Sequence, residues 1–492
     1  MLATLRIDPQ SPGPAISPWL FGHFLENLGA CLYRGGLLDA AGRPRDEIVR
    51  RMREMGVPIL RWPGGLFADG YHWRDGVGSN RPVRPNKYWG RYGPLLGPKD
   101  PNLFGTHEFV ALCRDLGAEP YININLGSGT PREAADWVAY CNQTRGPEAE
   151  QRARNGATDP LGVRVWGIGN ETYGFWSIGH CDAKTYAGRY REFHAAMSEA
   201  DASITPVAVG TCDLWPEWNP VVLGEVGERM AYLALHVYLP SMNNPLYLAR
   251  PIGGGAANHA SLCAAGVEVA RKIRFVAAQI RDAGLAGRVR IALDEWNLWW
   301  WVLQTYKTWW RMRDAVALAG MAGAIVEHAE VVGMANLAQA INVLGLIRAD
   351  ASRVVVTPLW HVMRMFAAAL RGERLAVTPI GPTFSTRKLG AIPPTGAIPT
   401  VEAWAARDGD AIGAVVAQRR WHGPVRVRVD APGVRWTSIE ILSAPHPDLR
   451  NDFAHPEAVR ALERPWDGDE IELPAACVAR LAGVMAPPGP SS

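Results

Sequence analysis

The sequence lacks the cysteine pattern of a disulfide-stapled or zinc-binding protein. Its seven cysteines are odd in number and scattered along 492 residues. None of them forms a Cys-x-x-Cys pair or a Cys/His cluster with the spacing that a zinc site or a redox motif needs. We therefore expect reduced thiols and no metal site.

The chain also lacks a long apolar run and a strong excess of charge. No stretch of about 18 apolar residues occurs, and the start, MLATLRIDPQ, has no basic segment followed by an apolar one. The 51 basic and 48 acidic side chains leave a net charge of +3 without a Lys/Arg run. These absences predict a cytoplasmic protein with a neutral substrate and with neither a membrane nor a nucleic acid as partner.

Tryptophan, in contrast, is abundant, with 20 residues in the chain. Six of them crowd into one short stretch, at Trp296, Trp299, Trp300, Trp301, Trp309 and Trp310. Flat aromatic faces can stack on sugars, but tryptophan is also a common core residue. The cluster therefore permits a carbohydrate site without requiring one.

Eight short β-rich runs recur along the first two thirds of the chain, and helical composition fills the segments between them. The runs are Pro18 to Asn27, Val57 to Pro63, Glu119 to Leu126, Val163 to Glu171, Pro206 to Cys212, Tyr232 to Tyr238, Val289 to Asn297 and Val331 to Gln339. Strands that alternate with helices predict parallel pairing through βα crossovers. The expected fold class is therefore α/β, with a (β/α)8 TIM barrel.

The composition changes after the helical segment 359–370 to short β-rich runs separated by Gly, Pro and Asp, such as Ala411 to Gln418. Such a pattern predicts an antiparallel, jelly-roll-like β-sandwich. The opening stretch Ala3 to Asp8 has no helix of its own, so we expect it to pair with this sandwich. The predicted organisation is an N-terminal strand segment (1–16), a catalytic barrel (17–371) and a β-sandwich domain (372–492).

Polar side chains collect at the predicted carboxyl ends of the barrel strands, where the βα loops converge. They include Glu26, Arg61, Asn170, Glu171, His236, Tyr238, Asp294, Glu295 and Gln339. Hydrolysis of a glycosidic bond with retention needs two carboxyl groups about 5 to 5.5 Å apart, one as acid/base and one as nucleophile. Glu171 and Glu295 fit these roles. We expect Arg61 and Tyr238 to keep Glu295 ionised, and the pKa of Glu171 to be raised by the nearby negative charge.

Six motifs in a fixed order carry a resemblance to a known family. They are SPWLFGHFLENLG (17–29), LRWPGGLFADGYHWRDGVG (60–78), RVWGIGNETYGFWSIGH (164–180), LALHVY (233–238), LDEWNLW (293–299) and MANLAQAINVLG (334–345). With them the chain resembles glycoside hydrolase family 51, the α-L-arabinofuranosidases, essentially from end to end. The resemblance implies Glu171 as acid/base and Glu295 as nucleophile.

The resemblance also implies roles for the surrounding residues. Asn170 would bond the sugar 2-OH, Glu26 and Gln339 would hold furanose hydroxyls, and Tyr238 would position the nucleophile. Trp176 and Trp299 match aromatic positions near the pocket, and Arg61, His236 and Leu66 complete the predicted substrate site. The resemblance further implies a homo-oligomer, hexamers being common in the family, and no cofactor.

Four positions depart from the family pattern, and one of them is Trp62, which stands where Tyr is typical. Leu66 stands where Asn is usual, and Asn27 and Ala30 replace the usual His and Arg of E-H-L-G-R. A lost amide removes a polar contact of the kind that discriminates substrates strongly. An exo-α-L-arabinofuranosidase acting on arabino-oligosaccharides is the leading interpretation. A β-D-galactofuranosidase, a β-xylosidase, an endo-β-glucanase and a non-catalytic carbohydrate-binding protein remain alternatives.

Metal-dependent enolisation on the same fold is a further alternative, since strand-end Asp and Glu residues can bind Mg²⁺. Asp294 and Glu295 are adjacent on one predicted strand, and successive strand residues point to opposite faces. We therefore expect these two carboxylates not to act in one site.

Overall fold

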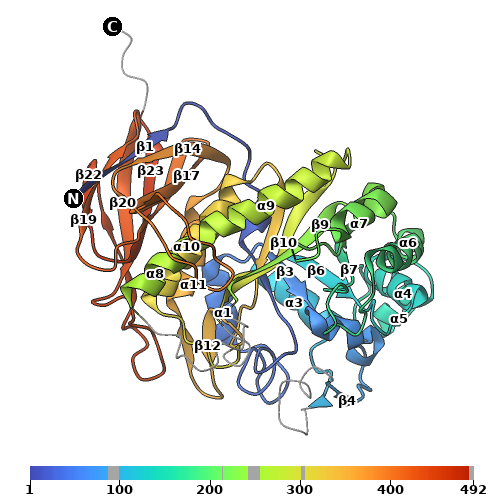
Figure 1. Cartoon of the computed structure of the whole chain (residues 1–492). Coiled ribbons are helices and arrows are strands. Elements are labelled where there is room, and N and C mark those ends of the chain that lie inside the picture. Colours follow the sequence, from blue (N-terminus) through green and yellow to red (C-terminus); the bar gives the residue numbers. More distant parts are fainter. Residues whose placement is uncertain (87–98, 213, 242–254, 301–304, 487–492) are drawn as a thin grey trace.

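The computed structural model describes residues 1–86, 99–212, 214–241, 255–300 and 305–486. Within these residues the chain forms two parts, a barrel surrounded by helices and a smaller unit made mainly of strands (Figure 1). Helices α10 and α11 lie between the two parts.

Eight parallel strands of the described chain close into a barrel, which confirms the predicted fold. In chain order they are β2 (Gly22–Phe24), β3 (Ile59–Trp62), β6 (Glu119–Ile124), β7 (Val165–Ile168), β8 (Thr205–Ala208), β9 (Tyr232–Pro240), β10 (Arg290–Trp299) and β11 (Val332–Leu337). Each strand lies within or overlaps one of the eight β-rich runs. Because all strands run in the same direction, their carboxyl ends open onto one rim.

Helices cover the outside of the barrel, and local sequence signals set where several of them begin and end. They are α1 (Asp46–Met55), α3 (Thr106–Leu116), α4 (Pro131–Asn142), α5 (Pro147–Arg154), α6 (Ala183–Ala200), α7 (Trp218–Val226), α8 (Ala256–Leu262), α9 (Ala265–Asp282), α10 (Met312–Glu327) and α11 (Pro358–Ala369). The Thr130 and Asp182 side chains accept N-cap hydrogen bonds at α4 and α6. Helix α1 ends at Gly56, which adopts a left-handed conformation with φ 76°.

The strand-rich unit is a sheet of nine described strands. In chain order they are β1 (Leu2–Asp8), β14 (Glu373–Ile380), β17 (Val401–Asp408), β18 (Ala411–Gln418), β19 (Val425–Asp430), β20 (Val434–Ser443), β21 (Arg460–Pro465), β22 (Glu470–Leu473) and β23 (Cys477–Met485). Strand β1 lies between β14 and β19, antiparallel to the first and parallel to the second. Short strand pairs β4 (Arg84–Pro85) with β5 (Lys99–Asp100), β12 (Ile347–Ala349) with β13 (Val354–Val356), and β15 (Thr383–Phe384) with β16 (Ile398–Pro399) lie outside it.

This sheet folds over on itself, because strands from both of its ends contribute to one core. Leu5 of β1, Val427 of β19, Val416 of β18 and Leu481 of β23 are all buried in it. The core is separate from the larger one of the barrel. A two-layered arrangement of strands around a common core is a sandwich.

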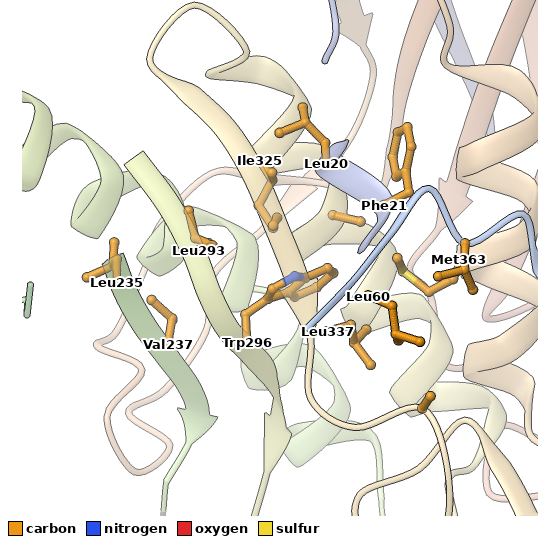
Figure 2. Close-up of a cluster of buried hydrophobic side chains, with 14 of the residues drawn as sticks. Leu20, Phe21, Leu60, Leu235, Val237, Leu293, Trp296, Ile325, Leu337 and Met363 are labelled. Atoms are coloured by element: carbon orange, nitrogen blue, oxygen red, sulfur yellow. The ribbon is translucent and has the colours of Figure 1, made fainter. Parts of the chain in front are cut away.

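The main core packs the outer faces of the barrel strands against the helices (Figure 2). Leu235 and Val237 of β9 alternate with residues that face the barrel interior, as expected for a strand. On β10, however, Leu293 and Trp296 lie in the same outer cluster although three positions separate them. The simple alternation is therefore broken between these two residues.

Candidate active site

A β-bulge on β10 decides which side chains reach the barrel interior. The register of β10 shifts between Ala292 and Glu295 against β9, and between Leu293 and Trp296 against β11. A bulge inserts one extra residue and so resets the alternation of side chains. As a result, Asp294 and Glu295 both point inward and both contact the Arg61 guanidinium, at 3.3 Å and 2.8 Å. The expectation that these neighbours face opposite sides of the sheet is wrong.

Glu295 is held from two directions at the carboxyl end of β10. Arg61 Nη1 donates to its Oε1 at 2.8 Å, and the Tyr238 hydroxyl donates to its Oε2 at 2.7 Å. Gly65 passes so close that a Cβ there would lie 2.5 Å from Glu295 Oε1. Charge-assisted hydrogen bonds of this kind fix the orientation of a carboxylate.

Glu171 follows β7 in a left-handed backbone conformation with φ 45°. His236 Nδ1 lies 2.8 Å from its Oε1, and Trp176 Nε1 donates to its Oε2 at 2.5 Å. Burial by itself would raise the pKa of Glu171. The hydrogen bond and charge of His236, with smaller contributions from Trp176 and Arg61, outweigh burial and hold this pKa below its ordinary value.

The low pKa of Glu171 corrects the expectation that its carboxyl titrates higher than usual. The expected cause of a raised pKa is the negative charge of Glu295. His236, however, lies close to both carboxylates and interacts with the charge of each. Burial lowers the pKa of His236, yet the charges of Glu295 and Glu171 raise it above its ordinary value. Both shifts favour a proton on His236 beside an ionised Glu171.

The two carboxyl groups stand at the separation that retention requires. One oxygen of Glu171 and one of Glu295 lie within 4.8 Å of each other and of a His236 ring nitrogen. Retaining glycosidases hold their carboxyl groups about 5 to 5.5 Å apart, whereas inverting ones leave room for a water between them. The same three atoms could in principle ligate a cation, but the carboxylates already accept hydrogen bonds from Arg61, Tyr238 and Trp176.

Glu26 and Gln339 form a second polar group at the rim, on the neighbouring ends of β2 and β11. Gln339 Nε2 donates to Glu26 Oε2 at 2.8 Å, and the Phe67 N–H donates to Oε1 at 2.9 Å. Burial, with the charge of Glu295, raises the pKa of Glu26 to about 7. Glu26 can therefore both donate to and accept from hydroxyl groups near neutral pH.

Asn170 and Leu66 lie on the loops that frame the carboxylates. Asn170 Oδ1 accepts from Arg61 Nη2 at 2.7 Å, while its buried Nδ2 has no hydrogen-bond partner among the described residues. Leu66 begins a 3-10 turn (Leu66–Gly70) and is partly buried against the core. Its neighbours Gly65 and Phe67 contact Glu295 and Glu26, so Leu66 sits between the two polar groups.

The tryptophan cluster divides between core and site. Trp296, Trp300 and Trp310 are buried in the core, and Trp301 lies outside the described residues. The Trp299 ring packs edge-on to Tyr238, with ring centroids 5.7 Å apart. Of the predicted aromatic pair, Trp176 thus touches Glu171 directly, and Trp299 reaches the site through Tyr238.

Two residues of the site, Tyr121 and Trp215, were missed from the sequence. The Tyr121 hydroxyl donates to Asp294 at 2.8 Å, and Asn336 Nδ2 donates to the same carboxylate at 3.2 Å. Trp215 packs against Trp176, with ring centroids 5.9 Å apart. Tyr121 lies two positions before Asn123 in the run 119–126, so the alternation of a strand could have placed both side chains on the same face.

The fold and the paired carboxylates define the class of protein. Glu171 and Glu295 stand at the carboxyl ends of non-adjacent strands of a closed (β/α)8 barrel, where such enzymes carry their chemistry. The chain is a barrel glycosidase with the carboxyl spacing of the retaining type. No helix in the described part of the chain is long and apolar enough to cross a bilayer.

The chain belongs to glycoside hydrolase family 51, the α-L-arabinofuranosidase family. Residues 51–243 match the family model of the α-L-arabinofuranosidase 1 domain, and residues 294–477 match that of the α-L-arabinofuranosidase C-terminal domain. An intracellular exo-α-(1→5)-L-arabinofuranosidase of Streptomyces lividans is 30% identical over 95% of this chain and 72% of its own length. An intracellular exo-α-L-arabinofuranosidase of Bacteroides ovatus is 30% identical over 74% of this chain and 72% of its own.

Solved structures agree with this membership. The arabinose complex of the Thermotoga maritima α-L-arabinofuranosidase is 30% identical, with a TM-score of 0.82 over 98% of this chain and 99% of that one. The family 51 arabinofuranosidase of Xanthomonas axonopodis pv. citri is 28% identical, with a TM-score of 0.85 over the same shares. The likeness covers the barrel and the strand-rich unit together.

Proposed function

We propose that this protein is a retaining exo-α-L-arabinofuranosidase that removes terminal non-reducing α-L-arabinofuranosyl residues from arabino-oligosaccharides. The observation that carries the proposal is the pair of carboxyl groups within 4.8 Å at the ends of β7 and β10, in a chain of this family. The sugar is inferred from the names of the relatives, two of which are named as exo-acting arabinofuranosidases.

In the proposed reaction Glu295 attacks the anomeric carbon while Glu171 protonates the leaving oxygen. Arg61 and Tyr238 hold the Glu295 carboxylate oriented for this attack. The ester between the sugar and Glu295 is then hydrolysed by a water, from which Glu171 takes a proton. The 2.8 Å contact between His236 Nδ1 and Glu171 Oε1 gives a direct route by which His236 can supply the proton that Glu171 transfers to the leaving oxygen.

The remaining predicted residues act as the sugar-binding groups of this proposal. The buried Nδ2 of Asn170, which has no hydrogen-bond partner among the described residues, lies like Glu295 Oε1 beside Gly65 and is suited to a hydroxyl next to the anomeric carbon. Glu26 and Gln339 supply a donor and acceptor pair for further hydroxyls. Trp176 and Trp299 border the site, while partly buried Leu66 adds apolar surface.

A panel of nitrophenyl glycosides tests the specificity. We expect clear turnover of the α-L-arabinofuranoside and little or none of the β-D-galactofuranoside and β-D-xylopyranoside. Leu66 stands where the family usually has an asparagine. The comparison of substrates is therefore necessary, since one polar contact can change the discrimination between two sugars by orders of magnitude. Turnover of another member without the arabinofuranoside would refute the proposed specificity while leaving the mechanism intact.

Azide rescue tests the two catalytic roles. Glu171→Ala should form a glycosyl azide of retained configuration, because Glu295 still makes the covalent intermediate that azide then attacks. Glu295→Ala should give inversion, because azide replaces the missing carboxylate and attacks the substrate directly. NMR of the azide products distinguishes the configurations, and exchanged outcomes would reverse the assignment.

Location, assembly and domain limits complete the proposal. The two relatives quoted above are named intracellular, which supports a cytoplasmic location for this protein. We propose a homo-oligomer, which light scattering of the purified protein would test. The proposed domain limits are 1–16 for the N-terminal segment, 17–371 for the barrel and 372–492 for the strand-rich domain, and β14 begins at Glu373, next to the second boundary.

A further inference from the structure

Asp294 is a buried carboxylate that the proposed reaction does not use. It is 2% exposed and lies next to the nucleophile on β10. Three side chains from three different strands converge on it: Arg61 Nε at 3.3 Å, the Tyr121 hydroxyl at 2.8 Å and Asn336 Nδ2 at 3.2 Å. The carboxylate therefore joins β3, β6 and β11 to β10 inside the barrel.

Arg61 is the group through which Asp294 can act on the reaction. Its guanidinium is completely buried, donates from Nη1 to Glu295 and from Nη2 to Asn170, and faces Asp294 with Nε in an ion pair at 3.3 Å that lacks hydrogen-bond geometry. A planar guanidinium has a fixed fork of donors, so its orientation at one carboxylate determines where its other donors point. One buried cation is also shared between two carboxylates.

We propose that Asp294 is a positioning residue, which orients Arg61 toward Glu295 and Asn170 and keeps part of the guanidinium charge away from the nucleophile. The proposal rests on the proposed glycosidase function and adds to it a residue that never touches substrate. The bulge of β10 is what makes it possible, because a regular strand would turn Asp294 or Glu295 outward.

A purely structural role for Asp294 makes a different prediction. A buried ion pair whose partners are far from the chemistry contributes to stability without affecting turnover. Glu440 of β20 offers the matched case, since it is 5% exposed and paired with Arg364 and Arg480 in the strand-rich unit. Comparing the two carboxylates separates positioning from ordinary buried pairing.

The experiment compares Asp294→Asn with Glu440→Gln and the wild type, using the aryl glycoside that the wild type hydrolyses best. Asp294→Asn keeps the shape of the side chain but removes its charge. We expect kcat to fall about 100-fold with KM changed less than about threefold, because a small misplacement of Glu295 affects mainly the chemical step. The acid limb of kcat/KM should move to lower pH, because the variant removes a negative charge from beside the guanidinium. Glu440→Gln should lower thermal stability and leave kcat and the pH profile unchanged.

Tyr121→Phe provides a second variant, because it removes only the hydroxyl that fixes Asp294. We expect a loss of kcat of about 3- to 10-fold with an unchanged KM. A kcat and pH profile equal to wild type in folded Asp294→Asn, or in Tyr121→Phe if the first variant does not fold, would overturn the proposal. If the wild type itself hydrolyses no aryl glycoside, the proposed function fails, and the result is distinct from any loss seen only in the variants.

Discussion

At the scale of single residues, the proton of the site is shared by two side chains. His236 and Glu171 are 2.8 Å apart, and their opposite pKa shifts describe one ion pair. Groups coupled this closely lose protons as a pair, so the pair and not either residue sets the pH behaviour. The acid form of Glu171 is therefore available as long as the pair retains its proton.

This coupling predicts where activity falls on the alkaline side. The pKa of His236 is raised, so its proton is lost only as the pH rises through a value above the ordinary 6.5. We expect kcat/KM to stay at its plateau beyond pH 6.5 and to fall at higher pH, as measured with a nitrophenyl substrate of low KM. A descending limb centred below pH 6.5 would contradict the pairing of His236 with Glu171.

At the scale of elements, hydrogen bonds of Asp69 connect three of the loops that follow barrel strands. Asp69 lies in the turn after β3, and its carboxylate accepts from Ser177 in the loop after β7, the loop that carries Glu171 and Trp176. Its backbone carbonyl accepts from Ser128 in the loop after β6. Burial raises the pKa of Asp69 to about 7, although the Ser177 and Gly179 hydrogen bonds oppose the rise.

The raised pKa makes the stability of Asp69→Asn relative to wild type depend on pH. The folded protein binds a proton at Asp69 up to about pH 7, while the unfolded chain releases it near 3.8, so wild-type stability falls as the pH rises between these values. The asparagine variant cannot lose this contribution. Its thermal midpoint relative to wild type should therefore rise from pH 5 to pH 8, by an amount equivalent to about 2 kcal/mol.

Asp182→Asn is the control for this measurement. Hydrogen bonds from Thr185 lower the pKa of the exposed Asp182 at the start of α6, so it titrates below the window from pH 5 to pH 8. The difference in thermal midpoint between Asp182→Asn and the wild type should be constant across that window. If the difference in thermal midpoint between Asp69→Asn and the wild type is also constant from pH 5 to pH 8, Asp69 is ionised in the folded protein throughout this range.

At the scale of the whole molecule, the barrel and the strand-rich unit meet along α10 and α11. Trp404 of β17 is buried at this junction, where its ring lies near Phe366 of α11, with centroids 5.6 Å apart. Its Nε1 donates to Glu327 at the end of α10, at 3.2 Å. Gly323 leaves the space for this ring, because a Cβ there would lie 1.9 Å from it.

Replacing Gly323 with alanine should therefore separate packing at the junction from helix propensity. We expect Gly323→Ala to destabilise the protein by about 1–3 kcal/mol through overpacking against Trp404. Gly188→Ala, within α6 and with open space at its Cβ position, should stabilise it by about 0.5–1 kcal/mol. Thermal unfolding checks both predictions. A stabilised Gly323→Ala variant would show that the Trp404 ring moves aside at little cost in free energy.

The sequence by itself determined the barrel, the order of its strands and the residues at their ends. Strand and helix patterns are local, and strands of one direction bring their carboxyl ends to one rim, so Glu171 and Glu295 could be paired across 124 positions. Arg61 and Tyr238 could be placed beside Glu295 by the same reasoning. None of this required knowledge of packing.

Only the tertiary structure decided how the site is charged and oriented. The bulge that turns Asp294 and Glu295 to the same side arises from the register of β10 against two neighbours, which no local pattern records. The raised pKa of His236 depends on distances between residues of three strands, and the hydrogen bond and charge of His236 reverse the pKa shift that the charge of Glu295 alone suggested for Glu171. Register, burial and electrostatics are properties of the assembled barrel, so these features could not be read from the order of the residues.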